Sequence, residues 1–122
     1  MGKSTPDEIT TFLKQAKVLI SQGKRRFLER DKNISSISNM GLTIEQAWAE
    51  ILELTYREYL GGPELDDNPR YATKGHLWWM FGIEVSELQV YIKLRIAASN
   101  VVVCLSFHEA EYPLFCPYQD TR

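Results

Sequence analysis

The stretch from Gln89 to His108, QVYIKLRIAASNVVVCLSFH, decides the fold class. Apolar and polar residues alternate through its first part, QVYIKLRI, and again through VVVCLSF. A period of two is typical of a β-strand that buries one face against a core. The stretch AASN separates the two runs and predicts a hairpin turn. We therefore expect two antiparallel strands here, joined through Ala98 and Ser99.

The alternation also predicts the register of this hairpin, because a one-residue slip would turn the apolar set to the wrong face. The apolar sets that should share one face are Val90, Ile92, Leu94 and Ile96 in the first strand, and Val101, Val103, Leu105 and Phe107 in the second. A two-residue turn then gives three cross-strand pairs: Tyr91 with Ser106, Lys93 with Cys104, and Gln89 with His108. The opposite face would carry Tyr91, Lys93, Arg95, Ser106 and His108.

The N-terminal half of the chain predicts two helices. Thr5 and Glu8 have the spacing of a capping box and precede apolar residues at helical intervals, so a helix is expected over about residues 6–22. Thr43 and Gln46 have the same spacing ahead of AWAEIL, which predicts the start of a second helix.

The remaining segments complete the fold prediction. RRFLE is expected to form a short strand, residues 30–41 a loop, and residues 59–75, which are rich in Gly, Pro and Asp, an exposed loop. HLWWMFGIEV predicts a third strand covered on both faces, and Tyr118 and Phe115 are expected to close over the sheet edge. We expect a single α+β domain over residues 1–122, with two N-terminal helices packed on a small antiparallel sheet whose last three strands form the C-terminal half.

Composition and charge limit the classes of function. The chain has 122 residues, of which 44% are hydrophobic and 25% charged, as in an ordinary globular domain. No apolar run approaches the roughly 20 residues of a membrane span, and MGKSTPDEIT has no signal-like core, so we expect a cytoplasmic protein that does not bind membranes. Cys104 and Cys116 lack the spacing of a metal or redox motif, which predicts free thiols and no metal site.

A net charge of −2 means that any contact with nucleic acid must use a local basic patch. The clearest patch in the sequence is GKRRFLERDK, and within it Lys24, Arg25 and Arg26 are candidate RNA-binding residues. The alternative is that this stretch is simply a solvated strand and loop.

The polar face of the hairpin offers a second set of candidates. RNA carries its own nucleophile in the 2′-hydroxyl, so its cleavage needs only an acid, a base and cations around the phosphate. His108 has an unperturbed pKa suited to acid–base work, and Tyr91 can donate a proton or a hydrogen bond. Lys93 and Arg95 can bind phosphate. The alternative is an ordinary polar strand face that meets water.

Several stretches carry a family resemblance: STP before the first helix, GLTIEQAWAEILELTYREYLGGPELD, LWWMFG, VYIKL and VVVCLSFHEAEYPLFCPY. In this order they resemble the MqsR-type toxins (motility quorum-sensing regulator) of bacterial type II toxin–antitoxin systems, which share a RelE-like α+β fold. The resemblance implies an mRNA interferase, an endoribonuclease that cuts mRNA without a metal or small-molecule cofactor and is held inactive by an antitoxin protein. It also implies catalytic roles for Tyr91 and Lys93, and His108 stands where related toxins have a lysine.

Two positions depart from the family pattern. Leu60 stands where the family has a lysine after its second helix, and Met80 where it has a glutamine beside the strand tryptophan. These departures keep a second hypothesis open, in which the same scaffold is a non-catalytic module that binds or inhibits another protein. Such a module would use the acidic loop at Glu64, Asp66 and Asp67.

Overall fold

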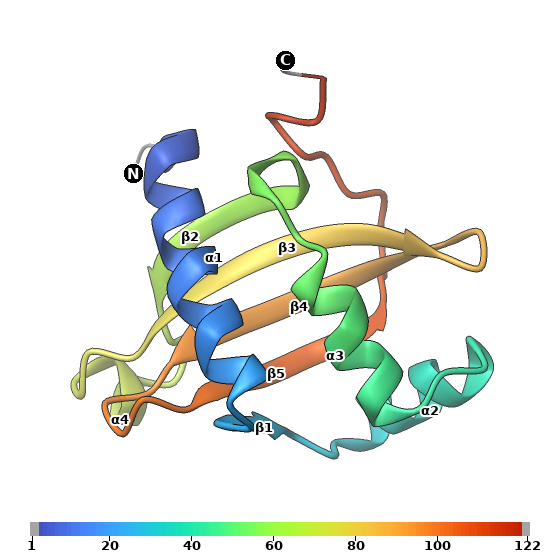
Figure 1. Ribbon diagram of the computed structural model, residues 1–122, viewed down its shortest axis with the longest axis horizontal. Helices are drawn as coiled ribbons and strands as arrows, with labels where there is room; N and C mark the ends of the chain where they lie inside the picture. The colour runs from blue at the N-terminus through green and yellow to red at the C-terminus, as the bar shows by residue number, and fades with distance from the viewer. Residues whose placement is uncertain (1–2, 121–122) are drawn as a thin grey trace.

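In the computed structural model, which describes residues 3–120, five strands form one sheet in the order β1-β5-β4-β3-β2 (Figure 1). The strands are β1 (Arg25–Phe27), β2 (Tyr59–Leu65), β3 (Leu77–Val85), β4 (Leu88–Ile96) and β5 (Val102–Glu109). The helices are α1 (Pro6–Ser21), α2 (Asp31–Asn39), α3 (Ile44–Leu52) and α4 (Pro69–Ala72), with a 3-10 turn, η1, at Tyr56–Glu58. The expected α+β class is confirmed. The sheet is mixed rather than antiparallel, because β1 joins its edge in the same direction as β5.

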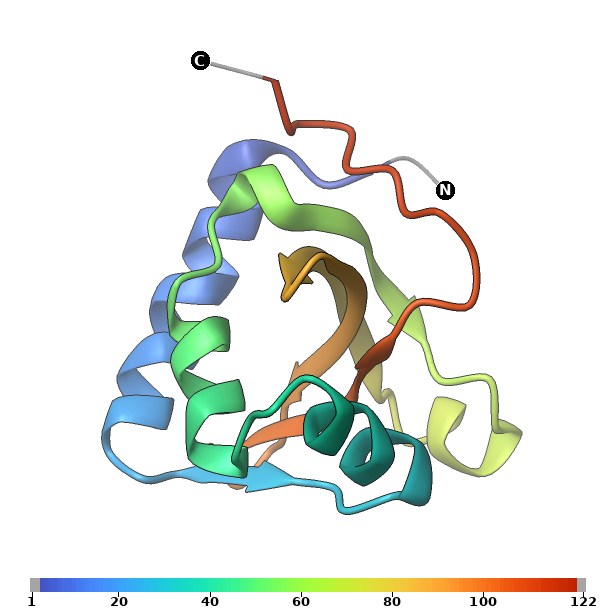
Figure 2. The same cartoon turned by 90° about the vertical axis from the view of Figure 1, so that its right-hand side faces the viewer.

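Helices α1 and α3 cover one face of the sheet, as Figures 1 and 2 show. Both predicted capping boxes are present: the hydroxyl of Thr5 accepts a hydrogen bond from the Glu8 amide, and the hydroxyl of Thr43 accepts one from the Gln46 amide. The core lies between these helices and the sheet, and each large apolar side chain buried there contributes roughly 1.5–3 kcal/mol. The two predicted helices correspond to α1 and α3, and the sequence pattern did not predict α2 and α4.

Strand β3 is covered on both faces, as its composition predicts. Trp79 and Phe81 point toward the helices, where the Trp79 ring stacks on Phe12 with 4.6 Å between ring centroids. Trp78 and Met80 are also buried, although they point to the opposite face. The outer face of the sheet therefore has its own small apolar floor beneath the polar side chains of β4.

Residues 30–41, predicted as a loop, contain the helix α2. Only Asn33 and Ile37 of this helix are buried, so it lacks the long apolar stripe that would have predicted it. Its stability comes from contacts with β5 instead, which a pattern of local residues does not reveal.

Residues 59–75, predicted as an exposed loop, contain strand β2 and the short helix α4. Strand β2 pairs with β3 in an irregular register around the Gly-Gly-Pro sequence, as an edge strand can. Gly62 has a φ of 104°, and a Cβ atom there would lie 2.4 Å from the carbonyl oxygen of Trp78. The glycine that suggested a loop is thus required by close contact between two strands.

The β4–β5 turn lies where it was predicted, but the register differs. The Asn100 amide donates to the Ala97 carbonyl at 2.9 Å, which closes a turn over the two residues between them. Asn100 then adopts a φ of 60°, and this extra residue shifts the register by one, so that Ile96 pairs with Val102. A β-bulge at Leu105 shifts the register by one more residue.

Because the second shift restores the predicted alternation, only the residues of β5 before the bulge point to the opposite face from the one predicted. Val102 and Cys104 are buried in the core, so the prediction that Val101 and Val103 would occupy it is wrong. Phe107 lies beyond the bulge and is buried in the core, as predicted.

The C-terminal segment leaves β5 and passes back over the outer side of the sheet (Figure 2). Tyr118 packs on Tyr59, with 6.1 Å between ring centroids, and its hydroxyl donates to the Ser4 carbonyl at 2.7 Å. Phe115 is 80% exposed, so the prediction that it closes over the sheet edge is wrong. The segment is held by Tyr118 at one end and by β5 at the other, and the residues between them border the sheet surface described next.

Candidate functional site

Tyr91 and His108 lie opposite each other on the neighbouring strands β4 and β5. Their ring centroids are 5.7 Å apart and the ring planes are tilted by 38°. Lys93 and Ser106 form the next pair on the same face, so the predicted partners were wrong but the predicted grouping is observed. The reason is that two one-residue shifts add up to a whole period of the strand.

His108 is held in one tautomer by its own strand end. Its Nδ1 lies 3.0 Å from the Glu109 carbonyl oxygen, which can only accept, so Nδ1 carries the proton and Nε2 keeps its lone pair. Burial lowers the pKa of His108; the hydrogen bond to Glu109 opposes this, and the positive charges of Lys32 and Arg30 lower it further. The ring is therefore neutral near pH 7 and presents Nε2 as a base.

Tyr91 has the opposite character. Burial, with smaller contributions from Tyr112, Glu64 and Asp67, raises the pKa of Tyr91 to about 12. The phenol keeps its proton at any physiological pH and acts as a hydrogen-bond or proton donor. A base and a donor thus stand side by side on one sheet surface.

Lys93 and Arg95 continue this surface along β4. The Lys93 ammonium and the Arg95 guanidinium lie 5.9 Å and 5.7 Å from the ring centroid of Trp78, in cation–π contact. The Trp78 indole N–H donates to Asp66 of the acidic loop at 2.7 Å, which holds this carboxylate beside the sheet. Within residues 3–120, neither Lys93 nor Arg95 forms a direct ion pair, although the Asp66 carboxylate is close enough to interact electrostatically with both.

Helix α2 contributes residues that the sequence reading did not place. Arg30, just ahead of the helix, donates to the Leu105 carbonyl at 2.9 Å and lies 3.4 Å from the Ser106 hydroxyl. Asn33 donates to the carbonyl of the bulge residue Leu105 and accepts from the amide of Phe107, two residues further along β5. Arg30 belongs to the basic stretch GKRRFLERDK. Because residues 30–41 were predicted to form a loop, the sequence did not indicate that Arg30 lies beside β5.

The predicted RNA-binding residues of the basic stretch, Lys24, Arg25 and Arg26, do not form one continuous surface. Arg25 pairs with Glu45 of α3 at 2.6 Å, on the side of the sheet that faces the helices. Arg26 is exposed, and Arg26 and Arg95 flank the same residue of β5, so Arg26 extends the basic surface. Lys24 is exposed at the start of β1 and lies apart from the Tyr91–His108 pair along the sheet.

A small cavity of about 150 Å³ opens directly beside the Tyr91–His108 pair. Its lining consists of Tyr91, His108, Ala110, Glu111, Tyr112 and Leu114. Pockets for drug-sized ligands measure about 300–1,000 Å³, so this one suits a single ring rather than a large cofactor. Leu114 also packs over Gly82, where a Cβ atom would lie 3.0 Å from its methyl group.

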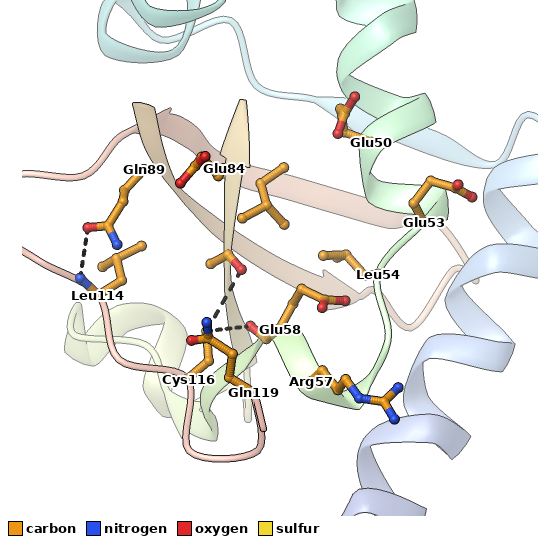
Figure 3. Close-up of a pocket in the computed structure, with 12 residues that line it drawn as sticks. Glu50, Glu53, Leu54, Arg57, Glu58, Glu84, Gln89, Leu114, Cys116 and Gln119 are labelled. Carbon is orange, nitrogen blue, oxygen red and sulfur yellow. Dashed lines mark hydrogen bonds between the residues drawn. The ribbon is translucent and has the colours of Figure 1, made fainter. Parts of the chain in front are cut away.

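A larger cavity of about 390 Å³ lies on the other side of Leu114, between α3, η1, β3 and the C-terminal segment (Figure 3). It contains none of the predicted site residues. Its lining includes four carboxylates, from Glu50, Glu53, Glu58 and Glu84, with one guanidinium, from Arg57. Because this surface would repel a phosphate, the smaller cavity is the better candidate for a nucleic-acid substrate despite its size.

No protein-family model and no curated protein matches this chain. Within residues 3–120, no three His, Cys, Asp or Glu side chains are grouped so that they could hold a metal ion. No helix in that range is long and apolar enough to cross a membrane. Function has to be inferred from the chemistry of the site itself.

Proposed function

We propose that this protein is an endoribonuclease whose active site is the outer face of β4 and β5. The observation that carries the proposal is the Tyr91–His108 pair, in which a neutral imidazole with a free Nε2 stands beside a protonated phenol. Lys93 and Arg95 follow on the same strand face and supply positive charge for the phosphate. Base, donor and cations are the groups that cleavage of RNA through its own 2′-hydroxyl requires.

The reaction can be written with these residues alone. His108 Nε2 removes the proton of the 2′-hydroxyl as the 2′-oxygen attacks phosphorus and the bond from phosphorus to the 5′-oxygen breaks. Tyr91 donates its phenolic proton to the departing 5′-oxygen, while Lys93 and Arg95 stabilise the negative charge that builds up on the phosphate. Proton exchange with water then returns His108 to its neutral form and Tyr91 to its protonated form. The products are a 2′,3′-cyclic phosphate and a 5′-hydroxyl.

The family resemblance extends this proposal to a biological role. On that basis the protein is an MqsR-type toxin with a RelE-like fold, an mRNA interferase that acts in the cytoplasm and is neutralised by an antitoxin protein. Of the residues that the resemblance implies, Tyr91 and Lys93 lie in the proposed site, and His108 replaces the lysine of related toxins. Its unprotonated nitrogen can serve as a base at a pH where a lysine would ordinarily be charged.

The direct test is to incubate the purified protein with a single-stranded RNA in the presence of a chelator, with and without ribosomes. We expect fragments that end in 2′,3′-cyclic phosphate, and growth arrest with loss of mRNA when the protein is expressed alone in bacteria. RNA that stays intact in both reactions, together with normal growth, would refute the proposal.

The cleavage rate is expected to depend on pH in a way set by His108. A base must be unprotonated, and the pKa of His108 is lowered from 6.5, so the rate should rise through a midpoint below pH 6.5 and then stay level. Tyr91, with its pKa raised to about 12, should cause no alkaline decline in the neutral range. The measurement is kcat/KM between roughly pH 4.5 and 9.

Unfolding must be followed over the same pH range as a control. A buried neutral histidine with a lowered pKa makes the folded state less stable as pH falls below 6.5, because the unfolded chain binds the proton more readily. Circular dichroism would separate this loss from titration of the base. A midpoint above pH 6.5 in the folded protein would contradict the role given to His108.

A second candidate function is favoured by the larger cavity. Its four carboxylates suit a lysine or arginine side chain of a partner protein, as a non-catalytic binding module would require. This reading predicts that the chain leaves RNA intact, and that its partner is released when Glu50 and Glu53 are changed to lysine rather than when His108 is changed.

A further inference from the structure

We propose that the small cavity beside Tyr91 and His108 binds the base of the nucleotide next to the cleaved phosphate, with Tyr112 as stacking residue and Glu111 as the group that distinguishes one base from another. This inference rests on the proposed function and adds to it the part of the substrate that the site recognises.

The wall of the cavity is the loop of residues 110–114, and both ends of this loop are hydrogen-bonded to Gln89. The Ala110 amide donates to the Gln89 carbonyl at 2.8 Å, and the Leu114 amide donates to the Gln89 side-chain oxygen at 3.1 Å. Gln89 thus holds both ends of the loop against the beginning of β4. The residues between these anchors stand over the catalytic pair instead of packing into the core.

Tyr112 is the aromatic side chain on this loop, and it is 72% exposed although it borders the cavity. Its phenol is close enough to Tyr91 to influence the ionisation of that residue. A large exposed aromatic ring beside an open cavity is the arrangement by which proteins stack unpaired bases of single-stranded RNA. Leu114 and Ala110 supply the apolar remainder of the lining.

Glu111 and Lys32 supply the polar edge of the cavity. The Lys32 ammonium forms an ion pair with Oε1 of Glu111, which lies on the cavity lining. The hydrogen bond and charge of Lys32 lower the pKa of Glu111, so it is an ionised acceptor at neutral pH. Its second oxygen can accept from the amino group of cytosine, whereas uracil places a carbonyl oxygen at that position and would be repelled.

The position of the cavity links the base to the chemistry. Tyr91 and His108 form its floor, so a base held against Tyr112 leaves its own ribose and phosphate next to His108. The larger cavity cannot serve in this way, because it contains neither residue and its lining is acidic.

The test uses two probes that differ at the Watson–Crick edge of the base, cytidine 3′-monophosphate, with a 4-amino group and an unprotonated N3, and uridine 3′-monophosphate, with a 4-carbonyl group and an N3–H. We expect both to shift the amide signals of residues 108–114 in NMR titrations, with the cytidine nucleotide binding about tenfold more tightly. Tyr112→Ala should weaken both probes by about tenfold or more, and Glu111→Gln should remove the difference between them. Phe115→Ala is the matched control, since Phe115 is also a highly exposed aromatic residue on the same segment but does not line the cavity.

The outcomes separate this inference from the proposed function. Nucleotide binding with these mutational effects in a protein that leaves RNA intact would support the base site and refute the ribonuclease. RNA cleavage that Tyr112→Ala leaves unchanged, or signals that shift away from residues 108–114, would refute the base site and leave the ribonuclease standing. Equal effects of Tyr112→Ala and Phe115→Ala would show nonspecific binding of the nucleotides to this segment and overturn the inference.

Discussion

Replacing His108 by alanine is expected to reduce RNA cleavage by at least about 100-fold, because a positioned acid or base typically contributes 10²–10⁴-fold to the rate. The variant should also abolish growth arrest when it is expressed alone. His108 is the histidine that lines the cavity, and its Nδ1 is bonded to the Glu109 carbonyl, which leaves Nε2 as the basic nitrogen. Tyr91→Phe removes only the hydroxyl and should cause a similar loss while the ring still packs.

The matched control for His108→Ala is His76→Ala. His76 stacks on Tyr71 with 5.4 Å between ring centroids and lies outside both cavities, so its loss should leave cleavage unchanged. Because His108 is mostly buried, circular dichroism and an unfolding curve must show that the alanine variant is folded at the assay temperature. Persistent arrest in folded His108→Ala and Tyr91→Phe proteins would remove both residues from the site.

The segments that were predicted correctly are those in which local signals agree with tertiary packing. The capping box at Thr5 and the apolar spacing after it are sufficient to define α1, and period-two alternation defines β4. These patterns record, within one segment, which face of the helix or strand is buried against the core. The α+β class followed from them.

The register of β5 could not be predicted because it depends on backbone conformations that the alternation does not encode. Asn100 takes a left-handed conformation, which asparagine tolerates better than most residues, and Leu105 forms a bulge supported from α2. A run such as VVVC allows either face to be buried, since both alternating sets are apolar. Its orientation was decided by the turn.

The candidate site was predicted in part for a related reason. His108 of β5 shares the outer face with three residues of β4, Tyr91, Lys93 and Arg95, because the two one-residue shifts in β5 add up to a full strand period. Arg30 and the loop around Tyr112 reach the site through contacts between segments that are distant in sequence. A sequence pattern can state which face a strand residue occupies, but not which distant segment crosses over it. Such a segment forms the wall of the cavity, and the sequence pattern therefore could not predict the cavity.

Replacing Asn33 by alanine is expected to destabilise the fold by roughly 2–4 kcal/mol. The side chain is fully buried and makes three hydrogen bonds to backbone: its Nδ2 donates to the Leu28 carbonyl at 2.8 Å and to the Leu105 carbonyl at 2.9 Å, and its Oδ1 accepts from the Phe107 amide at 3.1 Å. Leu105 keeps its bond from Arg30, but the Leu28 carbonyl and the Phe107 amide lose the partner that Asn33 provides. Each such loss costs about 1–3 kcal/mol.

The measurement is a urea unfolding curve beside that of Asn39→Ala, an exposed position at the end of the same helix that should change stability by less than about 0.5 kcal/mol. Asn33 also holds the bulge after which Ser106 and His108 return to the outer face, so the variant should lose RNA cleavage at temperatures where it is still folded. A loss of stability without a loss of cleavage would mean that the strand keeps its bulge unaided. A change below 1 kcal/mol would mean that water replaces the amide, and that α2 covers β5 without determining its shape.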